Sequence, residues 1–365
     1  AAALALLRSF SQALPDPNNP IVIPQDAFSY FPHFDLDSMP RAVTSVGDRA
    51  FLSCRSLEDM IIEDNCALTH IGAMAFAHCN DLWYVHIGRS VTTVGRGAFA
   101  SCSRLKHLFL PTNAQYVEIA ESLCRDCVSL EEVTCPHTVH TIGNDAFLNC
   151  KRLSEAFVLP NGVTTIGNNA FAACLRLPAI TLPNGLTTIG DQAFRHCRSL
   201  EEARIPNTVE RIGSRAFDDC LHLRTVTLPD NPAFDTISAH LFGGRNALTD
   251  VTIPASVKRI GDGAFSGTWA QEDHLGDWDK EKDPLTTVAG GENVEYIGNH
   301  AFKWCKSLTT FPFASALKHA GSDAFQNCQS LSGPIVLDHP DPVTIERHAF
   351  ERCIGLTSLR IHSVA

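Results

Sequence analysis

The sequence has no long hydrophobic run and few basic residues. No segment approaches the roughly 18 consecutive apolar residues that a membrane-spanning helix requires, so we expect no membrane span. The 365 residues include 29 Lys and Arg against 40 Asp and Glu, which gives a formal net charge of -11 at pH 7. Because surplus acidic groups repel phosphate, this balance argues against nucleic acid or an anionic membrane surface as a partner.

Motifs that carry catalysis or bind cofactors are also missing. The sequence contains no GxSxG, no HExxH, no P-loop and no GxGxxG that opens a helix. Asp145, Asp262 and Asp323 recur at scaffold positions of a repeat, just before its Phe, which argues against a pair of catalytic carboxylates. The sequence therefore predicts no enzyme, no catalytic residue and no cofactor.

The sequence is equally poor in metal-binding patterns. Cys124 and Cys127 form one isolated "CRDC" without a matching second pair, which is weak evidence for zinc or redox chemistry. His86 and His107 could meet diagonally across two strands, but no carboxylate partner is evident in the sequence to complete a site. We therefore predict no bound metal.

What the sequence does contain is a repeat of 23 to 25 residues along almost the whole chain. The strings "VTTIGNNAFAAC" (163–174), "LTTIGDQAFRHC" (186–197) and "VERIGSRAFDDC" (209–220) share one pattern. A motif that recurs down a chain is usually structural. Counting the Phe of each "AF" pair, and Cys124 in the same slot, gives about fourteen units: Phe28, Phe51, Phe76, Phe99, Cys124, Phe147, Phe171, Phe194, Phe217, Phe242, Phe265, Phe302, Phe325 and Phe350.

Each unit reads LxxaxaPxxVxxIGxxAFxxCxx, where "a" is apolar. The alternation in LxxaxaP predicts a short strand with one buried face, and Pro ends that strand. VxxIG predicts a second short strand whose Gly permits a tight bend or a positive φ, and AFxxC predicts a turn or a short helical turn. One unit cannot bury its own apolar face, but stacked units can. We therefore predict a repeat solenoid with short parallel strands.

This pattern resembles the BspA-like (Treponema pallidum-type) leucine-rich repeats, and residues 21 to 362 carry the resemblance. The resemblance implies a leucine-rich repeat solenoid without shared catalytic residues. It also implies a setting at the cell surface or in secretion, where some members are adhesins. The sequence offers an opposing argument, because it has no N-x-S/T sequon and many thiols that suit a reducing, intracellular compartment. Both locations stay open.

A Cys follows the Phe slot by three residues in eleven of the fourteen units, as in Cys174, Cys197 and Cys220. The column could be a disulfide ladder or a metal array. Equivalent side chains in a stack point in parallel, however, which is a poor approach for a disulfide. We therefore expect buried free thiols beside a column of stacked core Phe rings.

Candidate binding residues stand at exposed strand positions, the second and fourth after each strand Leu. The early units place aromatic rings there, and exposed aromatic side chains are typical anchors of protein interfaces. The alternative is sideways packing on neighbouring strands or under an N-terminal helix. The candidate residues are Tyr84, His86, His107 and Phe109 at these positions, together with Trp83, which directly follows the strand Leu.

An insertion of about fourteen residues, "WAQEDHLGDWDKEKD" (269–283), interrupts the array. It contains Trp269 and Trp278, and long loops in compact repeats are disproportionately functional. Its acidic residues do not follow the spacing of an EF-hand. We predict a partner-contacting loop, with a solvated excursion as the alternative.

The two ends of the repeat array carry different segments. Residues 1–20 predict a helical cap or extension, and residues 21–365 the solenoid. The segment "LTSLRIHSVA" stops in or just past a strand with no polar cap visible, so we expect either that the native chain continues beyond Ala365 or that another molecule associates through this end.

Two functional hypotheses follow. The first is a non-catalytic interaction module or scaffold that binds a protein, or a glycan, through the exposed strand face and the insertion. The alternative is a structural subunit embedded in a larger assembly, with the chain end covered by a partner.

Overall fold

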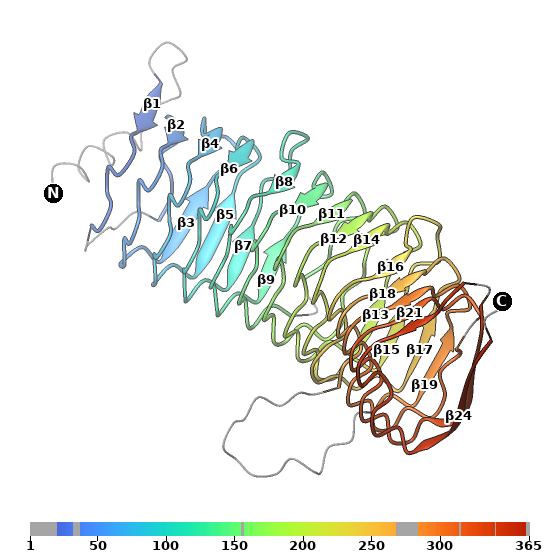
Figure 1. The fold of residues 1–365 in the computed structure, drawn as a ribbon. Helices are drawn as coiled ribbons and strands as arrows, with labels where there is room; N and C mark the ends of the chain where they lie inside the picture. The colour runs from blue at the N-terminus through green and yellow to red at the C-terminus, as the bar shows by residue number, and fades with distance from the viewer. Residues whose placement is uncertain are drawn as a thin grey trace, which may run out of the picture. The chain divides into compact units, whose positions relative to one another are not determined.

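The structure, a computed structural model, describes residues 20–31, 37–154, 157–267, 284–313, 315–339 and 341–362. Across these ranges the chain runs as short parallel strands joined by turns, and none of the described residues is helical (Figure 1). The predicted solenoid is therefore confirmed, and AFxxC forms turns rather than helical turns. The described part of the chain likewise holds no helix that could cross a membrane. Apart from Pro20, the predicted cap at 1–20 lies outside the described residues, as does the insertion at 269–283.

The chain forms two compact units, Ala1–Gly185 and Leu186–Ala365. In the first unit, Figure 1 shows β3, β5, β7 and β9 side by side, and they pair in that order. They span Asp59–Ile62, Tyr84–Ile87, His107–Phe109 and Glu132–Thr134. The VxxIG strands of this unit form two further groups, β1-β2-β4-β6 and β8-β10-β11. They span Ile21–Ile23, Val43–Val46, His70–Ile71, Thr93–Val94, Glu118–Ile119, Thr141–Ile142 and Thr165–Ile166.

The second unit repeats this arrangement. Its VxxIG strands pair as β12-β14 and as β16-β18-β20-β21-β23, with bounds Thr188–Ile189, Arg211–Ile212, Thr236–Ile237, Arg259–Ile260, Tyr296–Ile297, His319–Ala320 and Thr344–Ile345. Its other strands pair as β13-β15, β17-β19 and β22-β24. They span Glu202–Arg204, Thr225–Thr227, Asp250–Ile253, Thr287–Gly290, Ser332–Asp338 and Gly355–His362.

The core of each unit is a column of Phe rings. In the first unit, Phe51 stacks on Phe76 with ring centroids 5.0 Å apart, and Phe76 stacks on Phe99 at 5.5 Å. These rings are fully buried. In the second unit, Phe302 stacks on Phe325 at 5.1 Å. The predicted column of stacked core aromatics is confirmed.

The AFxxC turns use a backbone conformation that the sequence pattern does not reveal. Met74 and His78 flank Phe76 with φ of 52° and 60°. The N–H of Cys79 donates to the Phe76 carbonyl oxygen, which together with the positive φ of His78 gives the geometry of a type II turn. The N–H of Phe76 donates to Ala98 in the next turn at 2.8 Å. Because these N–H groups donate to carbonyl oxygens of the next turn, they do not make the hydrogen bonds within one segment that an α-helix requires.

The Gly of VxxIG is needed for space and not for a positive φ, so that part of the prediction was wrong. Gly72 does not have a positive φ. A Cβ atom at Gly72 would lie 2.5 Å from the nitrogen of Asp48 and 2.5 Å from the carbonyl carbon of Gly47. The backbone of the preceding turn therefore excludes any side chain here. Asp48 adds a contact of its own, since its Oδ1 accepts the N–H of Ala73 at 2.7 Å.

The Cys column consists of free thiols that donate to the preceding turn. Cys79 Sγ donates to the carbonyl oxygen of Phe51 at 3.2 Å, and Cys220 Sγ donates to that of Phe194 at 3.2 Å. Both side chains are fully buried. Burial raises the pKa of the Cys54 thiol to about 11, which keeps it protonated and able to donate. The interpretation as buried thiols is confirmed.

One repeat of the sequence carries Cys124 at the position where the other repeats have Phe. The same repeat has Tyr116 at the first position of VxxIG, where most other repeats have Val or Leu. Both residues are buried, and the pKa of Tyr116 is raised by burial and by the nearby Cys135 and Cys124. The hydroxyl of Tyr116 has no hydrogen-bond partner among the described residues. A buried aromatic ring at the first of these positions does not require the loss of Phe at the second, because Phe234 and Phe242 stand at the same spacing in another repeat and are both buried.

Candidate functional site

The outer face of β3-β5-β7-β9 carries the predicted aromatic residues in two rows. Strand pairing places residues of equal position directly beside each other. The first row is Asp59, Tyr84, His107 and Glu132, and the second is Ile61, His86, Phe109 and Thr134. Because alternate strand residues point to opposite faces, Val85 and Leu108 between the rows are buried in the core.

The five aromatic candidates form one continuous cluster, which we call the aromatic surface: Trp83, Tyr84, His86, His107 and Phe109. The Tyr84 ring lies 5.5 Å from Phe109 and 5.9 Å from Trp83, measured between ring centroids. His107 lies 6.1 Å from Trp83, and His86 lies 6.2 Å from Phe109. The Trp83 side chain is 42% exposed, and the other four are half-buried. These side chains therefore pack sideways on neighbouring strands and also remain partly exposed to solvent.

The two histidines contact protein groups on either side of the cluster. His107 Nδ1 lies 3.1 Å from Glu132 Oε2, and His86 Nδ1 lies 3.3 Å from the carbonyl oxygen of Ile62. They belong to different rows and contact different partners. Within the described residues, no group of three His, Cys, Asp or Glu side chains could together bind a metal ion.

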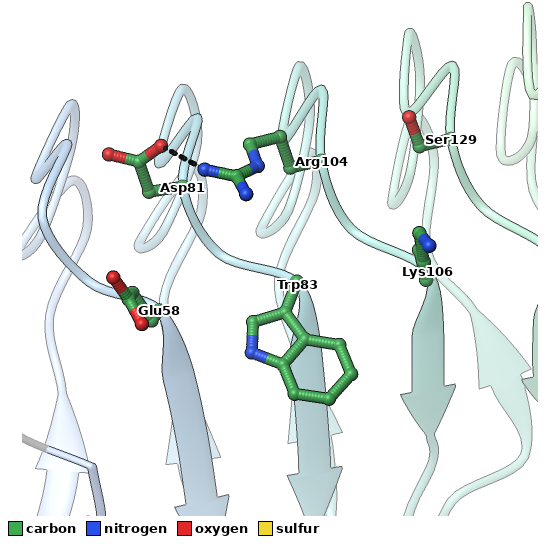
Figure 2. Close-up of a pocket in the computed structure, with 6 residues that line it drawn as sticks. All are labelled: Glu58, Asp81, Trp83, Arg104, Lys106 and Ser129. Atoms are coloured by element: carbon green, nitrogen blue, oxygen red, sulfur yellow. Dashed lines mark hydrogen bonds and ion pairs between the residues drawn. The ribbon is translucent and has the colours of Figure 1, made fainter.

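A shallow groove of about 450 Å³ adjoins the aromatic surface at the start of β5 and shares Trp83 with it. Figure 2 shows the Trp83 indole between Glu58 and Lys106, with Asp81 and Arg104 beyond it. Arg104 Nη1 pairs with Asp81 Oδ1 at 2.9 Å. The groove thus has an acidic side towards β3 and a basic side towards β7.

The acidic side continues onto β3. Asp59 is in register with Tyr84, and its Oδ1 is buried with no hydrogen-bond partner in the part of the chain that the structure describes. Burial raises the pKa of Asp59, and the negative charges of Asp37 and Glu58 raise it further. The carboxylate therefore sits beside aromatic rings in a place that disfavours its charge.

The other predicted positions do not belong to the aromatic surface. Trp269 and Trp278 lie outside the described residues. Phe157, which the strand pattern places on the exposed face, is instead buried and packs 5.3 Å from the ring of Phe147. The neighbouring Val158 is 66% exposed in its place.

Sequence reasoning missed an aromatic stack on the VxxIG strands of the second unit. The Arg259 guanidinium lies 4.1 Å from the ring centroid of Tyr296, and the His319 ring stacks on Tyr296 at 4.4 Å. The signal was the third residue of VxxIG, which is Arg259, Tyr296 and His319 in three successive repeats. Because Tyr296 contacts its neighbours on both sides, the stack is satisfied within the protein.

At the other edge of the second unit, β24 pairs with β22 and leaves apolar side chains exposed. Leu359 and Ile361 lie in register with Ile335 and Leu337, which are buried core residues. Leu359 and Ile361 themselves are 48% and 46% exposed. They continue the core rows, and no further strand pairs with β24 among the described residues.

Comparison with known proteins gives one family and several similar structures. Residues 21–154, 153–270 and 280–364 match the BspA type leucine rich repeat region. A leucine-rich repeat protein of Bacteroides ovatus is 21% identical, with a TM-score of 0.49 and 94% of this chain and 88% of that chain covered. A leucine rich cell surface protein of Faecalibacterium prausnitzii is 22% identical, with a TM-score of 0.41 and coverage of 94% and 83%. A T. pallidum leucine rich repeat protein is 29% identical, with a TM-score of 0.39 and coverage of 55% and 77%. The search of curated proteins gave no match.

Proposed function

Because this chain belongs to the BspA-type leucine-rich repeat family, we propose that it is a non-catalytic interaction module that binds a partner protein through the aromatic surface. The observation that carries the proposal is the gathering of five aromatic side chains on one outer strand face. Repeat solenoids use such faces for binding, since specificity lies in the residues that do not repeat. The outward positions of β13 and β15 in the second unit hold Glu202, Arg204, Thr225 and Thr227 instead, which makes a polar face.

The chemistry of the aromatic surface supports a protein partner. Trp and Tyr are enriched among interface residues that dominate binding energy, because they bury a large area with few rotatable bonds. Tyr84 is the first residue of β5, and the backbone N–H of Trp83 just before it donates to the Glu58 carbonyl oxygen, so the backbone of both residues is already ordered before binding. A rigid platform reduces the entropy lost on association. The insertion at 269–283 is proposed as a second contact.

Tyr84→Ala should weaken partner binding about tenfold to a hundredfold without unfolding the protein, because Tyr84 is only half-buried and lies at the centre of the aromatic surface, in contact with three of its other residues. Proximity crosslinking of the native protein in its source identifies the partner by mass spectrometry, and titration calorimetry measures the affinity. Thr225→Ala, at the matching outward position of β15, is the control. A glycan as the captured species, or an unchanged affinity of Tyr84→Ala, would contradict the proposal. A variant that lacks residues 270–282 tests the insertion separately.

A second candidate function is a structural subunit, and the exposed Leu359 and Ile361 on β24 favour it. In that case the crosslinks would concentrate on residues 355–362 and show a fixed set of partners. Substitutions in the aromatic surface would then leave assembly intact.

A further inference from the structure

We infer that the aromatic surface recognises a cationic side chain, arginine or lysine, of its partner protein, held over Trp83 and Tyr84 beside Asp37, Glu58 and Asp59. The inference rests on the proposed function and adds the chemistry of the partner. Three independent features carry it: the acidic residues without cations, the exposed aromatic rings next to them, and the charge division of the groove.

The acids at this edge differ from most acids nearby. Around them, Arg41 pairs with Glu63 at 2.6 Å, and Arg104 pairs with Asp81 at 2.9 Å. Asp37, Glu58 and Asp59 instead have no ion pair among the described residues, although the charges of Asp37 and Glu58 are close enough to act on Asp59. Like charges that gather without a counterion are unfavourable, so a bound cation would relieve their repulsion.

Asp59 is the most telling of the three. Its Oδ1 is shielded from water and accepts no hydrogen bond among the described residues. Asp59 as a whole is half-buried, and its other oxygen, Oδ2, is not among the buried atoms without a partner, so a cation of the partner protein would bind the carboxylate through Oδ2. Tyr84 is the strand neighbour in register with Asp59, which puts the carboxylate beside the aromatic surface.

The aromatic rings favour a cation over a neutral donor. Arginine and lysine cations are attracted to the faces of Trp and Tyr within about 6 Å of the ring centre. A guanidinium group can stack on a ring and donate two hydrogen bonds to a carboxylate at the same time, so we expect arginine to bind more tightly than lysine. A neutral sugar would also stack on Trp83, but it would gain little from the charges of three adjacent acids.

The groove fixes the direction of the partner. Glu58 and Lys106 lie on opposite sides of Trp83 (Figure 2). The N–H of Trp83 donates to the Glu58 carbonyl oxygen at 2.8 Å, and the N–H of Lys106 donates to that of Trp83 at 2.9 Å, so the three residues sit on successive turns. The cation therefore belongs on the β3 side, away from the exposed Lys106.

The test uses the full chain and a phage-displayed library of random linear peptides as the probe. We expect the selected peptides to be enriched in arginine and to lose binding to Tyr84→Ala. A selected peptide in which citrulline replaces arginine should bind the wild type about tenfold more weakly, because citrulline keeps the shape and loses the charge. Asp59→Asn should lower the affinity for the arginine peptide by a similar factor and should bind both peptides alike.

The controls separate this inference from the proposed function. Asp250→Asn, at the matching first position of β17, should bind like the wild type. Asp59→Asn should fold normally, because its carboxylate charge is disfavoured, and Glu58→Gln serves as a second variant. Peptides that need Tyr84 but contain no basic residue, or equal citrulline and arginine affinities, would overturn the inference and leave the proposed function standing. If no peptide depends on Tyr84, both fail.

Discussion

Gly72→Ala should lower the free energy of unfolding by about 3 kcal/mol, although it adds a single methyl group to a residue of ordinary φ. The new Cβ atom would lie 2.5 Å from the Asp48 nitrogen and 2.5 Å from the Gly47 carbonyl carbon. Carbon atoms in van der Waals contact stand about 3.5 Å apart, so the preceding turn would have to move by about 1 Å. It is not free to move, because the Gly72 N–H donates to Val46 at 2.8 Å.

Gly185→Ala is the matched control within the same unit. Its nearest neighbour would be the carbonyl oxygen of Asn161 at 3.8 Å, which is an ordinary contact. This substitution should be neutral or stabilising by a few tenths of a kcal/mol, because alanine restricts the unfolded chain. Thermal and urea unfolding of both variants measure the difference. Equal effects would show that turn spacing is adjustable and that the Gly is not required for close approach.

The strands of this fold were predictable because their signal repeats. A single LxxaxaP segment is ambiguous, but repeated copies at 23 to 25 residues exclude accidental alternation. The turn conformation was not predictable in the same way. Positions such as Met74 and His78 adopt a positive φ although neither is Gly or Asn, and the N–H of each donates to a carbonyl oxygen of the next turn. These hydrogen bonds join successive repeats, so the pattern within a single repeat does not predict them.

The candidate site was predictable only where the strand register stayed regular. Tyr84 and His107 were placed correctly by counting from the strand Leu. The same count failed at Phe157, because six residues separate Leu153 from Pro160 where most units have five. One extra residue exchanges the two faces of a strand, so Phe157 turned inwards and Val158 outwards. Counting back from Pro would have found this.

The acidic half of the site needed coordinates for a different reason. Glu58 precedes its strand and Asp59 begins it, and acids at such positions are common in the sequence. What distinguishes these acids is whether each forms an ion pair, and that depends on side chains one repeat away in the sequence. Arg104 neutralises Asp81, while nothing described neutralises Asp59. Sequence spacing gives the neighbours but not the pairs.

Phe217→Ala should cost more stability than any other change considered, about 3–5 kcal/mol. Phe217 is fully buried and stacks on Phe194 at 5.3 Å and on Phe242 at 5.9 Å. The cavity cannot close, because the N–H of Phe217 donates to Leu241 and so fixes the distance between turns. Amide hydrogen exchange should show lost protection in the turns on both sides. Ile354→Ala, at a position that is 80% exposed, should change stability by less than about 0.5 kcal/mol.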